Sequence, residues 1–137
     1  MIVVKQAAYE AMLAHARNLM GEMSCGLVGG RLENGKRLVE SFHPVSNTLH
    51  SPERFSPDRS EQSRVYTRLN GSGAAVVGTW FCHPNGDAAM TAYEIRAAHD
   101  RDGSYLVLSL ADPERPVLRS YRVWGGRADE ETLCLEP

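Results

Sequence analysis

The residues of this chain that could do chemistry gather between positions 81 and 94. The run Phe81-Cys82-His83-Pro84 closes an apolar segment, and Thr91 and Glu94 follow it, three residues apart. Imidazole and carboxylate groups bind zinc, but a catalytic zinc takes about three protein ligands, a water and a carboxylate that accepts the proton of this water. A histidine that only satisfies its own hydrogen bonds at a strand end would fit the same residues. Residue types alone therefore leave both a metal site and a structural histidine open.

Two predicted elements would hold these residues in place. The apolar run 74–83 is typical of a central strand, and residues 91–100 are predicted to be a helix with Thr91 near its start. Because residues at i and i+3 share one side of a helix, Thr91 and Glu94 would lie together. Alternation along the strand puts Cys82 on the face opposite His83, which favours a buried structural thiol over a ligand or a nucleophile.

The other predicted elements complete an α/β pattern around this segment. Residues 44–60 form an irregular, proline-containing loop of a length that is often functional, and Ser60 is predicted to cap the helix after it. Asn34-Gly35 is a strong hairpin signal. The remaining helices are predicted at 5–20 and 61–69, and the remaining strands at 24–29, 36–43, 104–110, 117–123 and 131–135. This order predicts a single α/β domain over residues 1–137, with a mixed, mostly antiparallel sheet flanked by helices.

Composition excludes several classes of function. The chain has 137 residues and a formal net charge of -2, which leaves no basic field for nucleic acid or an anionic membrane surface. No apolar run approaches the roughly 18 residues of a membrane span, and a charge at Lys5 comes too soon for a signal peptide. Three cysteines at irregular spacing argue against a disulfide framework. We expect a cytoplasmic protein that binds neither nucleic acid nor membrane.

The segment 81–94 resembles the metal motif of the JAMM/MPN (Mov34/JAB) metallopeptidases. In that family a His-x-His-Pro strand is followed by an Asp eleven residues after the second His, with a Ser three residues before the Asp. Here His83-Pro84 takes the place of the second His and the Pro, Glu94 stands at the Asp position, and Thr91 at the Ser position. The resemblance implies the family's single cytidine-deaminase-like α/β domain, a zinc cofactor, and His83 and Glu94 at metal-ligand positions.

Further stretches resemble the Mec+ branch of this family, bacterial hydrolases that release an amino acid from the C-terminus of a ubiquitin-like sulfur carrier. The resemblance implies such a sulfur-carrier protein as the partner. Arg54, Arg59 and Arg64 would suit the carboxylate end of a carrier, although a solvated basic surface also explains them. The matching stretches, which spread over nearly the whole chain, are Cys25-Gly26-Leu27, Asn47, 52–58, Asp112-Pro113 and 118–122.

The chain departs from the family where the chemistry is concentrated. Phe81 replaces the first His and has no lone pair for a metal. The general-base Glu of the first strand falls on Met23, which cannot take a proton. Neighbouring Glu22 would serve only if a bulge or a one-residue shift re-aimed its side chain. Glu94 can still act as a ligand in place of the Asp, and Thr91 keeps the hydroxyl of the Ser that it replaces.

The first of two hypotheses is a binding module. Met23 and Phe81 would form an apolar plug in the former metal pocket, which favours packing over chemistry. The protein would then be a catalytically impaired relative, or pseudoenzyme, that holds a ubiquitin-like sulfur carrier. It would alternatively form a homodimer, or a heterodimer with another MPN protein that is active.

The second hypothesis is an enzyme. A zinc-dependent metallopeptidase or isopeptidase would cleave at the C-terminus of the carrier through a rearranged site. His83 and Glu94 would be its ligands, Glu22 its base, and Thr91 a nearby hydroxyl. Cys25, on the strand face that would point at the site, is the candidate for a substitute soft ligand. Whether the chain is an enzyme at all stays open between these hypotheses.

Overall fold

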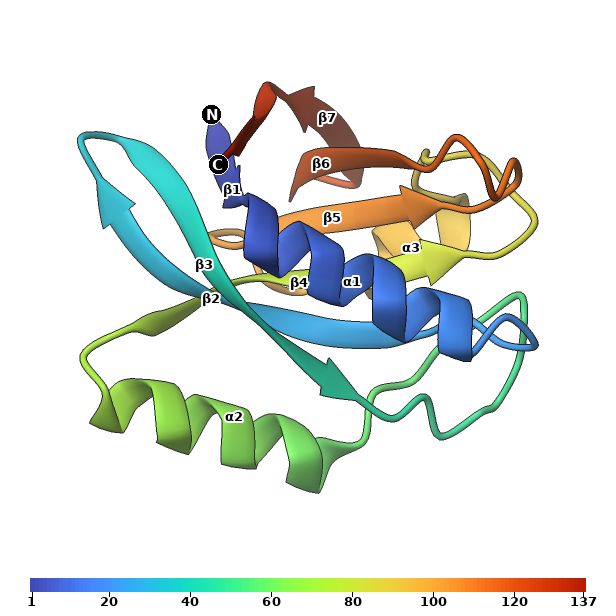
Figure 1. The fold of residues 1–137 in the computed structure, drawn as a ribbon, viewed down its shortest axis with the longest axis horizontal. Coiled ribbons are helices and arrows are strands. Elements are labelled where there is room, and N and C mark those ends of the chain that lie inside the picture. The colour runs from blue at the N-terminus through green and yellow to red at the C-terminus, as the bar shows by residue number, and fades with distance from the viewer.

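Eight strands form one mixed sheet, and three helices cover its two faces (Figure 1). The computed structural model describes all 137 residues. The strands are β1 (Ile2–Lys5), β2 (Cys25–Glu33), β3 (Lys36–Val45), β4 (Ala75–His83), β5 (Ser104–Ser109), β6 (Val117–Trp124), β7 (Arg127–Glu131) and β8 (Leu133–Glu136). The helices are α1 (Gln6–Asn18), α2 (Arg59–Gly71) and α3 (Ala92–Ala97).

The strand order explains how the two halves of the chemical segment meet. Across the sheet the order is β7-β6-β5-β4-β2-β3-β1-β8. Pairings β2–β3, β2–β4, β5–β6 and β6–β7 are antiparallel, and β1–β3, β1–β8 and β4–β5 are parallel, which confirms a mixed, mostly antiparallel sheet. Because parallel neighbours need a crossover, the chain leaves β4 at His83, passes through α3 and returns as β5. This crossover brings the start of α3 back to the end of β4.

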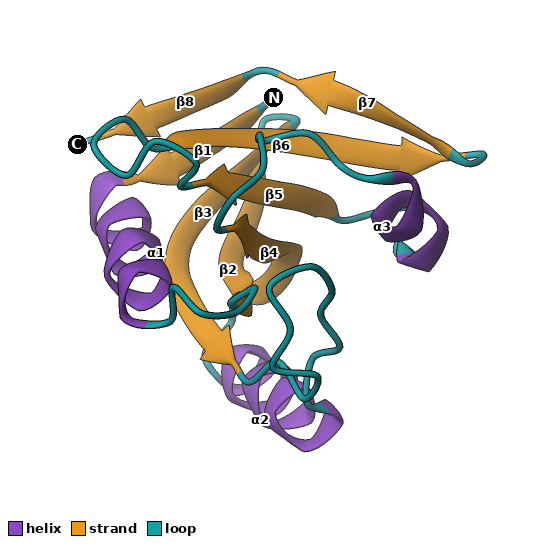
Figure 2. Cartoon of the chain, turned by 90° about the vertical axis from the view of Figure 1, so that its right-hand side faces the viewer, coloured by secondary structure: helices purple, strands orange, loops and turns teal.

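Strand alternation divides the core between the two faces of the sheet. Trp80 of β4 is fully buried against α1, where Met12 belongs to the same cluster. Phe81, one residue along, belongs to a cluster on the opposite face, close to α3. On that face Leu69 of α2 also packs against Leu27 of β2. Figure 2 shows α1 and α3 on opposite sides of the strands, so Trp80 and Cys82 at the end of β4 serve one core and Phe81 between them serves the other.

The structure adds two strands that the sequence patterns missed. β1 precedes α1, where a helix was expected to be the first element, and its Ile2 and Val4 are fully buried between β3 and β8. Its partners lie far along the chain, so no local pattern marks it. β7 is a run of mostly charged residues at one edge of the sheet, where alternation of apolar residues is not required. The expected edge strand at 131–135 is present as β8, shifted to Leu133–Glu136.

Two helix boundaries also differ from expectation. Asp58, not Ser60, caps α2, because its side chain accepts a hydrogen bond from the backbone N–H of Glu61. α3 ends at Ala97 instead of continuing to residue 100, and Ala98 is already extended. α3 is therefore a short helix of six residues, and Glu94 lies in its first turn.

A buried asparagine shapes the loop between β3 and α2, residues 46–58. The Asn47 side chain is 1% exposed and donates to the carbonyl oxygens of Met23 and Arg54, at 2.9 and 3.0 Å. Its Oδ1 accepts from the backbone N–H groups of Leu49 and Ser56, at 3.1 and 3.0 Å. One polar side chain therefore satisfies backbone groups along the loop and ties it to the start of β2.

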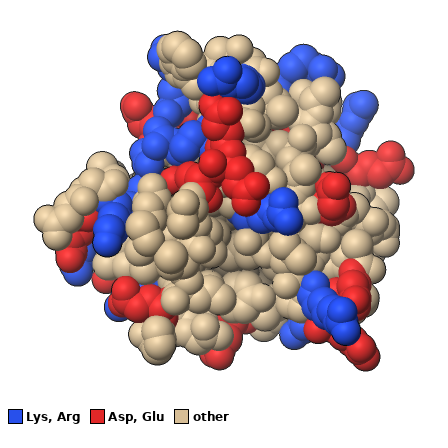
Figure 3. Space-filling model, turned by 90° about the horizontal axis from the view of Figure 1, so that it is seen from above, with Lys and Arg blue, Asp and Glu red and all other residues tan.

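The surface carries charges of both signs. Figure 3, which views the molecule from above, shows basic and acidic side chains interspersed, with no continuous positive area on this face. No helix is long and apolar enough to cross a membrane; the two longest, α1 and α2, have 13 residues each.

Candidate functional site

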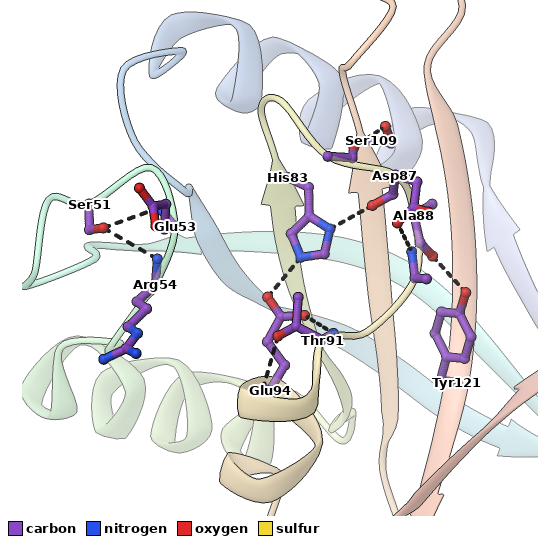
Figure 4. A network of polar contacts seen from close by, with 12 residues as sticks. Ser51, Glu53, Arg54, His83, Asp87, Ala88, Thr91, Glu94, Ser109 and Tyr121 are labelled. Atoms are coloured by element: carbon purple, nitrogen blue, oxygen red, sulfur yellow. Dashed lines mark hydrogen bonds and ion pairs between the residues drawn. The ribbon is translucent and has the colours of Figure 1, made fainter.

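His83 ends β4 with both ring nitrogens engaged. Its side chain is 9% exposed; Nδ1 donates to the backbone carbonyl oxygen of Asp87 at 2.6 Å, and Nε2 lies 2.7 Å from Glu94 Oε2 (Figure 4). Because a carbonyl oxygen only accepts, Nδ1 carries a hydrogen, and Nε2 faces the carboxylate. This tether through Nδ1 is also how proteins orient a metal-binding histidine, with Nε2 toward the metal.

Glu94 is held by the capping box at the start of α3. Its backbone N–H donates to Thr91 Oγ1 at 3.2 Å, and its Oε1 accepts from the backbone N–H of Thr91 at 2.8 Å. The second carboxylate oxygen is the one that meets His83. Thr91, expected to be a hydroxyl near the chemistry, is used as the helix cap. The six-residue helix α3 is thereby fastened to the end of β4 through one carboxylate.

The His83–Glu94 contact is a buried, proton-sharing pair. Burial lowers the pKa of His83, but the hydrogen bonds to Glu94 and to the Asp87 carbonyl outweigh this, so the net pKa lies above its ordinary value. A 2.7 Å contact between Nε2 and a carboxylate oxygen requires a proton between them. With both nitrogens occupied, His83 offers no free base to a substrate in this arrangement.

Phe81 fills the place of the family's first histidine with aromatic packing. Its side chain is 1% exposed and stacks on Phe55 of loop 46–58, with ring centroids 4.7 Å apart and an interplanar angle of 27°. The His83 ring lies 5.7 Å away. Met23 and Cys25, each 1% exposed, belong to the same apolar cluster. The structure thus places Met23 and Phe81 in one apolar cluster.

The structure gives Cys25 a different partner from a metal. Its Sγ donates to the backbone carbonyl oxygen of Val45 at 3.3 Å. Burial raises the pKa of the Cys25 thiol to about 12, so the thiol is protonated at neutral pH in this arrangement. Cys82 lies in the core cluster on the opposite face, and burial also raises its thiol pKa to about 12. Cys25, Cys82 and Cys134 are all free thiols.

Glu22 lies in a different cavity from His83. Its carboxylate contacts His50 Nδ1 at 2.9 Å, in a cavity that is also lined by His15 and Glu61. The bulges of β2 lie between Val28 and Gly30, beyond the start of the strand, so none re-aims Glu22. Met23, one residue on, does line the cavity of His83. The position of the family's base is therefore held by a thioether.

The donor set does not fit a catalytic zinc. The family implies zinc, but no group of three or more His, Cys, Asp or Glu side chains is gathered closely enough to hold a metal ion. His83 and Glu94 supply two donors and bind each other, and the third position is the ring of Phe81. About three protein ligands are usual for a catalytic zinc, so the residues present are one short.

One carboxylate near His83 was not singled out from the sequence. Glu53 on loop 46–58 lines the same open cavity, about 480 Å³ in volume, as Met23, His83 and Glu94 (Figure 4). Its side chain has no hydrogen-bond or ion-pair partner, in contrast to Glu94. The signal that could have found it is its place in a long, proline-containing loop, since such loops often carry function.

Together these features define a class of protein. A mixed sheet in which a histidine closes a central strand and meets a carboxylate from the next helix is the frame of a JAB-type domain. The family model described as prokaryotic homologs of the JAB domain matches residues 5–124. The chain therefore belongs to the prokaryotic JAB family, as the motif predicted.

Known relatives agree with this assignment. The protein is 29% identical over 132 residues to proteins named CysO-cysteine peptidase from Mycobacterium tuberculosis and Mycobacterium bovis, covering 96% of this chain and 89% of theirs. A solution structure of a protein from Desulfitobacterium hafniense has 38% identity and a TM-score of 0.92, covering 99% of this chain and 93% of that one. A Salinibacter ruber protein with 18% identity and a TM-score of 0.75 shares the fold, over 99% and 92% of the two chains.

Proposed function

We propose that this protein binds the C-terminal tail of a ubiquitin-like sulfur-carrier protein and has lost the family's zinc-dependent hydrolysis. The observation that carries the proposal is the pairing of the two remaining donors, His83 and Glu94, beside an aromatic ring in place of the third. Similarity to proteins named CysO-cysteine peptidase over 96% of the chain supports a carrier of this kind as the partner.

Loss of the base supports the same conclusion. General acid–base help is typically worth about 10²–10⁴ in rate. Met23 occupies the base position and is 1% exposed, while the neighbouring carboxylate of Glu22 is engaged with His50 in another cavity. A site that lacks both a metal ligand and the base can still bind a tail, but it lacks two groups that the family's hydrolysis needs.

The cleft itself supports binding. It runs between loop 46–58 and α3, and residues of both segments line its two neighbouring cavities. Arg59 lines one of them, and the Arg54 guanidinium lies 4.5 Å from the ring centroid of Tyr93, across the cleft. Neither arginine forms an ion pair within the protein. Two unpaired cations suit a tail that ends in a carboxylate.

Binding and hydrolysis are tested with the same material. A ubiquitin-like sulfur carrier is titrated into the protein by calorimetry, in its full-length form and with the last few residues of its tail removed. We expect saturable binding that requires the tail. The carrier with one extra C-terminal residue is then incubated with the protein in zinc-supplemented buffer, and its intact mass is followed. Binding without the tail, or cleavage of the extra residue, contradicts the proposal.

A specific observation keeps the zinc-dependent hydrolase as the second candidate. Glu53 is a free carboxylate at the mouth of the cavity that holds His83 and Glu94. A movement of loop 46–58 that brought Glu53 inward would add a donor or a base. This candidate predicts stoichiometric zinc that is lost in His83→Ala, together with cleavage that is lost in Glu53→Gln. Glu22→Ala would leave such cleavage unchanged if Glu53 is the base.

Pairing with a second MPN chain remains a prediction from the sequence. The edge strands β7 and β8 are the places where another chain could add to the sheet. Light scattering after gel filtration measures the mass directly. A mass of about one chain over the accessible concentration range would exclude a stable homodimer.

A further inference from the structure

A second cavity lies next to the one that contains His83. It has a volume of about 320 Å³ and is bounded by loop 46–58, α2, α3, β4 and β5. Glu94 lines both cavities, so the two are direct neighbours. The carboxylate charge of Glu94 is compensated by His83 and does not repel an anion as a free carboxylate would.

Aromatic rings form the apolar part of this cavity. The rings belong to Phe55, Phe81, Tyr93 and Tyr105, and Met90 adds a flexible apolar side chain. Phe81 stands where the family has its first metal-binding histidine. The residue that removes a metal ligand therefore also adds an aromatic ring to the wall of this cavity. The volume suits a single large apolar side chain better than a folded segment.

Three polar side chains around the cavity are without partners. Arg59 and Gln62 of α2 and Thr79 of β4 line it, and their side chains make no hydrogen bond or ion pair within the protein. The Tyr105 hydroxyl accepts from the backbone N–H of Asp100 at 2.9 Å, which leaves its own proton free to donate. Apolar walls with a few unpaired donors are what a ligand with an apolar body and an anionic end requires.

We propose that this cavity is a recognition subsite for the last residue of a peptide chain. A large apolar side chain packs among the rings, and the α-carboxylate pairs with Arg59 at the rim. The inference rests on the proposed function and adds a substrate class, a carrier tail whose final residue is bulky and apolar. A tail that ends in glycine would leave the rings uncovered.

Short peptides test the subsite by NMR with the full chain. The probes are N-acetyl-Gly-Phe with a free carboxylate, the same peptide as its C-terminal amide, and N-acetyl-Gly-Gly. We expect the free acid to shift backbone signals around Phe55, Tyr93 and Tyr105 in a saturable way. The amide and the glycine peptide should each bind about tenfold more weakly, since each lacks one of the two contacts. Equal affinity of all three peptides, or no saturable shift at these residues, overturns the inference.

Matched variants identify the contacts. Arg59→Gln removes the cation at the rim, while Arg64→Gln removes an exposed cation of the same helix that does not line the cavity. We expect about tenfold weaker binding of the free acid in the first and no change in the second. Ala97→Leu, on the wall formed by α3, should fill the cavity and abolish binding. Equal losses in the two arginine variants, or full binding in Ala97→Leu, contradict the proposed placement.

The full carrier separates this inference from the proposed function. A carrier ending in Gly-Gly and the same carrier extended by Phe are titrated into the protein. Tighter binding of the extended form, lost in Arg59→Gln, supports both ideas. Equal binding of the two forms overturns the subsite and leaves carrier binding standing. Binding of the free-acid peptide without binding of either carrier supports the subsite and overturns the carrier as partner.

Discussion

The buried pair of His83 and Glu94 should contribute strongly to stability, because it joins the end of β4 to the first turn of α3. The two side chains are 9% and 3% exposed. Removing one partner of a buried pair typically costs about 3–5 kcal/mol, since the other charge is left without compensation. Glu94→Ala also removes a hydrogen bond to the backbone in the capping box. We therefore expect it to lower the free energy of unfolding by an amount at or above the middle of that range.

Urea unfolding provides the assay, with buried Trp80 as a fluorescence probe. A cycle of His83→Gln, Glu94→Gln and the double variant isolates the pair. We expect a coupling free energy of about 1–3 kcal/mol. Glu53→Gln, which changes an exposed carboxylate of the same cavity, is the control and should stay within about 0.5 kcal/mol of the parent.

Two results would refute this reasoning. A coupling free energy near zero would mean that the contact contributes no net stability. The second result is a free energy of unfolding that rises steeply with added zinc in the parent but not in His83→Gln. A ligand that binds only the folded state stabilises it in proportion to the logarithm of the ligand concentration. Such a rise would therefore show that His83 and Glu94 bind a metal ion in preference to each other.

Three further predictions use other parts of the molecule. Phe81→His supplies a third donor on the strand face of His83, so the zinc content measured by metal analysis should rise toward one equivalent. An unchanged zinc content would mean that the missing ligand is not what prevents metal binding. With thiol pKa values of about 12, Cys25 and Cys82 should resist iodoacetamide at pH 8, where about one thiol in ten thousand is ionised, and Cys134 should be labelled first by peptide mapping. Asn47→Ala should lower the free energy of unfolding in urea by about 3 kcal/mol and speed proteolysis of loop 46–58, because buried backbone groups lose their hydrogen-bond partner. An unchanged rate of cleavage would refute the role of Asn47 in holding the loop.

The motif predicted the family because spacing along regular elements is a local property. His83 at the end of a strand and Glu94 eleven residues later fall where the crossover through α3 brings them together. The rule of strand alternation placed Cys82 on the face opposite His83. The family resemblance, and not periodicity, assigned Met23 to the site, where it lines the cavity of His83.

Long-range contacts were beyond local patterns. β1 was missed because its stability comes from β3 and β8, which lie far along the chain. Glu53 was missed because its nearness to His83 depends on the path of loop 46–58, which Asn47 sets through hydrogen bonds to backbone groups. The capping role of Thr91 was overlooked, although Thr91-Ala92-Tyr93-Glu94 has the sequence pattern of a capping box.

By itself, then, the sequence determined the family frame and the loss of two chemical groups, since a phenylalanine cannot bind zinc and a methionine cannot take a proton. Only the tertiary structure decided what became of the groups that remain. It showed that His83 and Glu94 bind each other, and that the ring of Phe81 forms the wall of a second cavity. The physical reason is that residue identity fixes which interactions a side chain can make, whereas its partners depend on how distant segments pack.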